Sequence, residues 1–551
     1  MNTKFNIFDL WAFWSPFRAL SRANRLQREK KFVRAFKLFS VAAQAGITEG
    51  ESAVGQHYLT GEGVSRNTRE AARWLTRAAI KGHIGSQRLL AGLYVSGLRT
   101  DDVCQPWTAL FAESQNTEID FEAALRWGLL AAEAGDRDAQ ATVGYVYLSK
   151  AEPFRDLDKA RFWYEQSAIG GSPQGHLGFG LICLREAAGH TEAILAAIGH
   201  IKEAAAANLA AAHYYLGTLY ETGTGVPQDY SLAVGHYGTA AKAGNRGAQA
   251  RFGDMLFNGI GIKANKICGE SWLRRAGLAG DALAAMMVAS IYARDGDLPP
   301  NYTEAMYWLR LAAEAGHSEA ARALGLHYLN GAGVPCDHGE AAIWFCRAAE
   351  GGDLVGAFNY GVCLLQGVGT ERDEVNAASW FRRAAAGVAS AQFWYGRILV
   401  EGRGVKANPE EARLWLQKCV DTGMPEAMVE LGNMNLKGIG GMVDQEAARQ
   451  LFERAAGKGH SGAMFALGAL YGGGYGISAN QAQALHWYRV AAEKHHPLAM
   501  LMLGKYLRVG IATSLDRNEA MYWLTQALEA GLSEAGAEIQ AMEQGITKIS
   551  P

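Results

Sequence analysis

The chain has 551 residues, of which 49% are hydrophobic and 20% are charged, values typical of a folded soluble protein. Its formal net charge of -2 argues against nucleic-acid binding, which requires a strong basic excess. The seven cysteines are odd in number and form no CxxC or CxxxC pair. We therefore expect reduced thiols, with neither a disulfide framework nor a zinc site.

The N-terminal segment, residues 1–31, is rich in aromatic and basic side chains. Residues 5–17 carry the aromatic ones, including Trp11 and Trp14, and a run of basic residues follows. The apolar run is too short to span a bilayer, and it lacks the order of charge and apolar residues of a signal peptide. We interpret the segment as a cap over the first repeat. An interfacial membrane helix and a protein-docking helix are the alternatives.

A repeat fills residues 32–535. A small residue, here called the anchor, recurs at intervals of 35 to 37 residues, with one longer interval of 53. Such a period predicts a repeat architecture rather than several globular domains. The anchors are Gly55, Ala91, Gly144, Gly180, Gly217, Gly253, Ala289, Gly325, Gly361, Gly396, Gly432, Gly468 and Gly504.

Each repeat predicts two helices. Helix A carries the anchor and ends at a Gly-x-Gly turn such as Gly61 and Gly63. Helix B begins at a polar cap such as Asn67 and carries a tryptophan near position 19 after the anchor. We expect these tryptophans to lie in the core between stacked helices. They are Trp74, Trp127, Trp163, Trp272, Trp308, Trp344, Trp380, Trp415, Trp487 and Trp523.

Two places depart from the repeat. An insertion at about residues 99–117 carries Trp107 and is either a functional loop or a tolerated one. The repeat anchored at Gly180 has Gly199 in the tryptophan position, and the next repeat has His236 there. Together with the small residues at 204–207, these changes predict weaker packing and a softer junction between the two repeats.

Trp394 occupies no repeat position, which makes it a candidate for binding. It lies two residues before its anchor, in a helix A stripe of varied composition that we predict to face a partner. An ordinary solvated face is the alternative. The first candidate patch is Asn359, Trp394, Arg397, Glu430 and Asn433. The second is Tyr215, Arg251 and Asp254.

The pattern Leu324-Gly325-x-x-Tyr328, Gly331-x-Gly333 and Ala341-Ala342-x-Trp344 resembles the Sel1-like repeat family, a relative of the tetratricopeptide repeats. The resemblance covers about residues 32–535. It implies an all-α fold, namely a right-handed α/α superhelical solenoid of about thirteen helix–turn–helix repeats. It also implies a concave surface that holds protein partners. The remaining residues, 536–551, are expected to form a C-terminal capping tail.

We therefore predict a non-enzymatic scaffold or adaptor that binds a protein partner. No catalytic, cofactor or metal site is predicted: the Gly-x-Gly strings follow helices rather than strands, and no HExxH motif occurs. A bacterial immunity or chaperone-type protein with one effector, and a secreted-type hydrolase, are the alternatives. We expect a cytoplasmic location, with residues 1–31 as a candidate contact to the inner face of the membrane.

Overall fold

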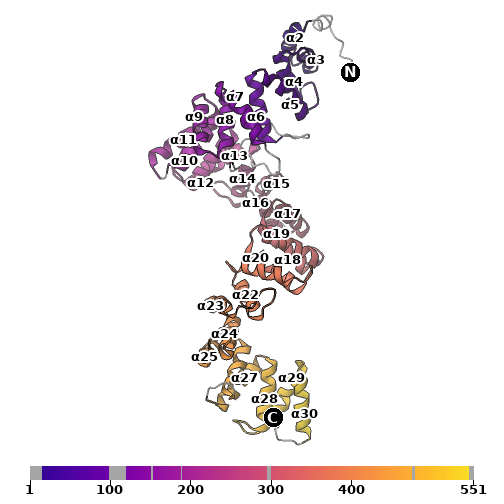
Figure 1. The fold of residues 1–551 in the computed structure, drawn as a ribbon, viewed down its shortest axis with the longest axis vertical. Helices are drawn as coiled ribbons and strands as arrows, with labels where there is room; N and C mark the ends of the chain where they lie inside the picture. Colours follow the sequence, from indigo (N-terminus) through magenta and orange to yellow (C-terminus); the bar gives the residue numbers. More distant parts are fainter. Residues whose placement is uncertain are drawn as a thin grey trace. The chain divides into compact units, whose positions relative to one another are not determined.

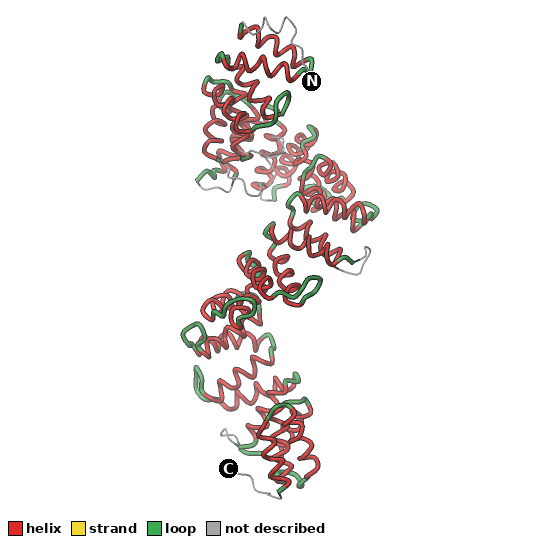
Figure 2. Tube along the Cα trace, turned by 90° about the vertical axis from the view of Figure 1, so that its right-hand side faces the viewer, coloured by secondary structure: helices red, strands yellow, loops and turns green. Residues whose placement is uncertain are grey.

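The computed structural model describes residues 15–97, 120–149, 153–187, 189–293, 300–473 and 478–544. All secondary structure in these ranges is helical, and it comprises 29 helices, α2 to α30 (Figures 1 and 2). The prediction of an all-α, helix–turn–helix repeat fold is confirmed. The candidate residues Trp11, Trp14 and Trp107 lie outside the described residues, as does the 99–117 insertion.

The helices fall into two compact units, residues 1–301 and 302–551. The first unit contains α2 (Pro16–Arg28), α3 (Phe32–Gln44), α4 (Thr48–Thr60), α5 (Thr68–Ile80), α6 (Ile84–Ser96), α7 (Phe121–Glu133), α8 (Arg137–Leu148), α9 (Leu157–Ile169), α10 (Pro173–Glu186), α11 (Thr191–Ala206), α12 (Ala210–Thr222), α13 (Tyr230–Lys242), α14 (Arg246–Asn258), α15 (Lys266–Leu278) and α16 (Ala282–Ala293).

The second unit contains α17 (Tyr302–Glu314), α18 (Ser318–Asn330), α19 (His338–Glu350), α20 (Leu354–Gln366), α21 (Glu374–Ala384), α22 (Ala389–Glu401), α23 (Pro409–Asp421), α24 (Pro425–Lys437), α25 (Gln445–Gly457), α26 (Ser461–Tyr471), α27 (Gln481–Glu493), α28 (Pro497–Val509), α29 (Arg517–Glu529) and α30 (Ser533–Glu543). Within each unit a helix packs mainly against its neighbours in sequence, as expected of a repeat array.

The anchor is a position where helix A approaches helix B closely. A Cβ atom on Gly325 would lie 2.6 Å from the ring of Phe345, which is 1% exposed. The same contact joins Gly432 to Phe452 at 2.6 Å. In both repeats the partner stands twenty residues after the anchor, directly after the tryptophan position. Only a very small side chain fits at the anchor because that buried ring occupies the space a larger one would need.

The prediction that the helix B tryptophans lie in the core is confirmed in full for three of the ten, and the other seven pack against the core but remain partly exposed. Trp127, Trp308 and Trp344 are buried, but the other seven are half-buried. Their indole groups lie at the edge of the core, where Trp415 donates to Glu411 at 3.3 Å and lies 3.9 Å from the ammonium of Lys418. An indole has a polar N–H and a face that attracts cations, so this edge suits it better than a dry interior.

The first two described helices, α2 and α3, form a pair that the sequence pattern missed. In α2, Ala19, Ala23 and Leu26 are fully buried against α3. Ala19 lies 36 residues before Gly55, in the anchor position. The pair was missed because it has no Gly-x-Gly turn; Lys30, with φ 56°, turns the chain instead. The described part of the predicted N-terminal segment therefore contributes a repeat helix.

Side-chain caps start most helices, as predicted. Asn67 accepts a hydrogen bond from the backbone N–H of Glu70 at 3.0 Å, and Asp353 likewise caps α20. The caps of α18 and α26 are histidines, His317 and His460. An unprotonated imidazole nitrogen accepts the same backbone hydrogen bond as an aspartate oxygen.

The tryptophan position of the Gly180 repeat is occupied by His200 rather than by Gly199. A Cβ atom on Gly180 would meet the carbonyl of Ala197 and the side chain of Ile201. In the other repeats these partners stand one residue closer to the anchor, as Ala71 and Leu75 do for Gly55. One extra residue therefore precedes this helix B, and it shifts the register by one.

The C-terminus of the array is closed by a single helix, α30, which packs against α28 and α29. Arg508 of α28 is 4% exposed and bonds to Glu538 of α30 at 2.9 Å. The capping helix begins at Ser533, slightly before the tail expected from the sequence.

Candidate functional site

The first candidate patch lies on one side of three successive A helices of the second unit. Asn359 is on α20, Trp394 and Arg397 are on α22, and Glu430 and Asn433 are on α24. All five side chains are half-buried. On each helix, the positions two before and one after the anchor are neighbours, so they form one accessible stripe.

Trp394 has a structural contact that its sequence position did not indicate. Its ring stacks on the buried ring of Phe381, with the centroids 6.1 Å apart and an angle of 11° between the planes. The guanidinium of Arg397 lies 5.3 Å from the Trp394 centroid and bonds to Glu401 at 3.1 Å. The indole is thus a partly accessible surface that contacts both a buried ring and a guanidinium group.

Three of the four polar side chains of the patch have no partner in the described part of the protein, the exception being Arg397. Within the described residues, the side chains of Asn359, Glu430 and Asn433 make no hydrogen bond or ion pair with the protein. Two further side chains of α24, Glu426 and Lys437, are exposed on the same stripe. These groups are hydrated in the free protein and can exchange water for a partner's polar groups.

The charged side chains of the second candidate patch are already engaged in ion pairs within the protein. Arg251 of α14 pairs with Glu221 of α12 and lies 3.6 Å from Asp254. Glu221 also accepts the hydroxyl of Tyr237 at 2.6 Å. Burial, reinforced by this hydrogen bond, raises the pKa of Tyr237. Arg251 and Asp254 therefore tie neighbouring repeats together, while Tyr215 lies on α12 against Tyr214.

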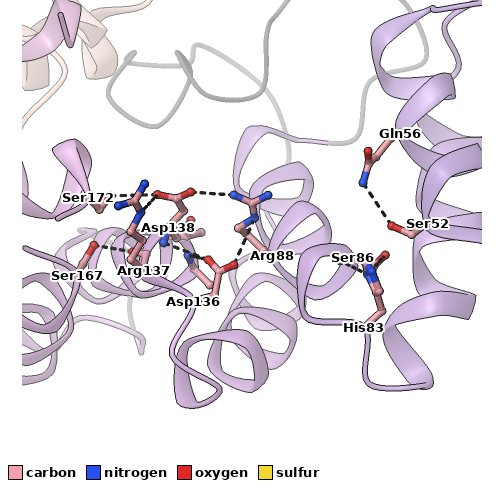
Figure 3. A network of polar contacts seen from close by, with 12 residues as sticks. Ser52, Gln56, His83, Ser86, Arg88, Asp136, Arg137, Asp138, Ser167 and Ser172 are labelled. Atoms are coloured by element: carbon pink, nitrogen blue, oxygen red, sulfur yellow. Dashed lines mark hydrogen bonds and ion pairs between the residues drawn. The ribbon is translucent and has the colours of Figure 1, made fainter. Parts of the chain in front are cut away.

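A polar network at the starts of the A helices of the first unit was not predicted (Figure 3). Arg88 of α6 bonds to Asp138 of α8 at 2.8 Å and lies 3.6 Å from Asp136, the cap of that helix. Ser172, before α10, donates to Asp138 at 3.2 Å. Figure 3 shows the three groups converging. The signal in the sequence is an arginine three residues before the anchor and an aspartate at the next cap.

The same arrangement recurs in the second unit, where Arg322 of α18 bonds to Asp353 before α20 at 3.2 Å. This network joins an arginine of one repeat to the helix cap of the next. We therefore interpret it as a contact that holds successive repeats together and not as a binding site.

The described residues offer little reactive chemistry. They contain no group of three or more His, Cys, Asp or Glu side chains arranged to hold a metal ion. Burial raises the pKa of Cys419 to about 11, which keeps this thiol protonated near neutral pH. In the same ranges, every helix is too short or too polar to cross a bilayer.

A model of the Sel1 repeat family matches twelve segments of the chain. It leaves out α6, α30 and the pairs α2–α3 and α10–α11. Both of these pairs lack the Gly-x-Gly turn and the tryptophan. The matched segments are residues 48–83, 110–136, 137–172, 210–245, 247–281, 282–317, 318–353, 354–387, 389–418, 425–460, 461–496 and 497–532.

A chitin synthase regulator of Saccharomyces cerevisiae is 30% identical over 135 residues, which are 24% of this chain and 17% of the regulator. The match thus spans less than a fifth of that relative. Among solved structures, a protective antigen of uropathogenic Escherichia coli is 23% identical, with 98% of this chain and 96% of the antigen covered and a TM-score of 0.45. A Sel1 repeat protein from Oxalobacter formigenes is 26% identical, with 56% and 89% covered and a TM-score of 0.45.

Proposed function

The chain belongs to the Sel1 repeat family, whose members are typically protein-interaction scaffolds, and we propose that it is a non-enzymatic adaptor that binds a protein partner. We place the binding surface on α20, α22 and α24 of the second unit. It comprises the first candidate patch, with Trp394 at its centre.

The observation that supports this surface is the contrast between its polar groups and those of the second patch. Asn359, Glu430 and Asn433 have no protein partner in the described residues, whereas Arg251 is engaged by Glu221 and Asp254. A partner that contacts the second patch would have to break existing ion pairs. At Asn359, Glu430 and Asn433 a partner displaces only water and gains hydrogen bonds.

The chemistry of the patch suggests how a partner is recognised. A half-buried indole held against Phe381 offers a rigid apolar anchor at low entropic cost. Carboxamides donate and accept, so Asn359 and Asn433 suit peptide groups of a partner backbone. The carboxylate of Glu430 favours a basic side chain beside them.

The test is the double variant Trp394→Ala/Arg397→Ala, compared with Tyr307→Ala. Tyr307 is 53% exposed on α17 and provides a matched loss of an aromatic ring outside the patch. Partners are identified by affinity purification with mass spectrometry, and the affinity of the purified pair is then measured. We expect the double variant to bind at least about tenfold more weakly, the loss of a typical interface hot spot. Unchanged affinity in a variant of wild-type helicity would exclude the patch.

The same purification separates the functional alternatives. One stoichiometric partner bound tightly would favour an immunity or chaperone-type role over a general adaptor. Turnover of ester, amide or β-lactam substrates by the purified protein would contradict the non-enzymatic proposal. The thiols of the described residues are free, which supports a cytoplasmic location.

A further inference from the structure

Two consecutive repeats of the first unit replace the helix B tryptophan with histidine. These are His200 on α11 and His236 on α13. The position four residues before the anchor on helix A also changes in these two repeats, to His176 on α10 and His213 on α12.

Elsewhere in the chain that helix A position is never histidine. Four repeats combine a glutamine there with the tryptophan, and the glutamine amide donates to a carbonyl of the preceding helix B, as Gln249 does to Ala241 at 3.3 Å. Histidine at one position is therefore matched by histidine at the other. The four glutamines are Gln87, Gln140, Gln249 and Gln392.

The two histidine pairs have the same geometry. The Nδ1 atoms are 3.0 Å apart in His176–His200 and in His213–His236. The ring centroids are 5.3 Å apart in both, with interplanar angles of 31° and 32°. These two distances place the nitrogens on the line between the ring centres, as in an N–H···N hydrogen bond. One imidazole must donate and the other must accept, so the accepting nitrogen carries no proton.

The surroundings give each pair limited compensation for positive charge. His200 lies near one carboxylate, that of Glu203 of α11, and it contacts the ring of Phe179 of α10 edge-on. His236 lies near the cation of Lys202 of α11 and stacks on Tyr220 of α12 with the planes 4° apart. The carbonyl of Ala205 of α11 faces His213.

We propose that the two histidine pairs form a proton-sensitive joint that loosens the packing of helix A against helix B in α10–α13 when the pH falls. A single extra proton leaves the bond intact, because an imidazolium can donate to a neutral imidazole. A second proton removes the acceptor and places two cations in contact. The bond then breaks, and the rings must move apart or into water.

The direction of the pH effect follows from the folded-state pKa values. Burial lowers the pKa of His200, His213 and His236 from the ordinary value of 6.5, and for His200 and His236 the neighbouring histidine lowers it further. Below 6.5 the unfolded segment therefore binds more protons than the folded one. The stability that the pairs contribute is present above pH 6.5. It is lost as the pH falls through the lowered pKa values that these histidines have in the folded state.

The experiment is hydrogen exchange of the full chain, resolved by peptide, at pH 7.5 and 5.5 and corrected for the intrinsic pH dependence of exchange. We expect amides of α11 and α13 to lose at least about tenfold in protection at the lower pH, relative to α8 and α14. The variant His176→Gln/His200→Trp/His213→Gln/His236→Trp restores the glutamine–tryptophan pairing of the adjacent repeats. It should abolish this loss.

A milder variant covers the case in which the fourfold change disturbs folding. His200→Gln/His236→Gln keeps a hydrogen-bonding side chain in each pair but removes one titrating group from each, and it should also abolish the loss. The proposal is overturned if wild-type α11 and α13 keep their protection at pH 5.5, or if either folded variant loses it to the same extent as the wild type.

Discussion

The anchor residue shows most clearly how one position constrains the fold. A Cβ atom on Gly217 would lie 2.7 Å from Cδ1 and Cε1 of Tyr237, whose ring is 1% exposed. The Tyr237 hydroxyl is held by Glu221, so the ring cannot move aside without losing a hydrogen bond. Glycine is needed here for space, although it costs helix stability.

Gly217→Ala should therefore destabilise the first unit by about 1–3 kcal/mol, the usual cost of overpacking a filled core. Gly235→Ala is the matched control on the facing helix, because a Cβ atom at Gly235 would meet nothing within 4 Å. That change should stabilise α13 by about 0.5–1 kcal/mol through helix propensity. Local exchange free energies of α12 and α13 measure both effects. Equal effects of the two substitutions would contradict the packing role of the anchor.

At the scale of the helix, the caps decide where each element begins, and several are histidines. His83, His317, His460 and His496 each accept a backbone N–H through Nδ1, with His496 capping α28 at 3.3 Å from the nitrogen of Ala499. The His496 ring also stacks on Phe465 with the centroids 4.9 Å apart. Each cap works only while Nδ1 is unprotonated.

The first turn of α28 should therefore weaken as the pH falls. Burial, aided by His460, lowers the pKa of His496 from 6.5, so the cap is intact above that pH and is lost as the pH falls through the lowered pKa of the folded state. The local stability of α28 should fall by about 0.5–2 kcal/mol, the usual contribution of a helix N-cap. His496→Asp should retain protection of α28 at pH 5.5, because a carboxylate titrates lower. Equal loss of protection in the wild type and in this variant would show that the cap is not the cause.

At the scale of the whole chain, a repeat array has to close its terminal apolar surfaces. At the N-terminus α2 covers Ala35, Leu38 and Phe39 of α3, and all three are at most 1% exposed. The outer side of α2 carries exposed basic residues and Phe17, which is 73% exposed. The same helix can therefore both cap the array and present a basic surface.

Two deletions separate these roles. Removing residues 2–14 should leave the thermal unfolding of the first unit unchanged, whereas removing residues 2–31 should expose Phe39 and lower the unfolding temperature by several degrees. Sedimentation with anionic vesicles tests the peripheral membrane contact proposed for residues 1–31. Loss of vesicle binding in the shorter deletion, with an unchanged fold, would support that contact. Unfolding caused by the shorter deletion would contradict the assignment of the cap to α2.

The proposed binding surface was only partly predictable. The stripe from Asn359 to Asn433 follows from helical periodicity, because residues three and four apart share a face. The contact of Trp394 with Phe381 does not, since it joins two different helices. The pairing of Arg251 with Glu221, thirty residues earlier, was hidden for the same reason.

The repeat length, the two helices of each repeat, the glycine turns and most polar caps could be predicted from the amino-acid sequence. These depend on local conformation and on a period that many copies reinforce. The packing of the anchor against the residue after the tryptophan, the role of α2 as a repeat helix and the pairing of the histidines became visible only in the folded chain. Each of these depends on which side chains from separate helices occupy the same space, and a spacing along one helix does not specify that.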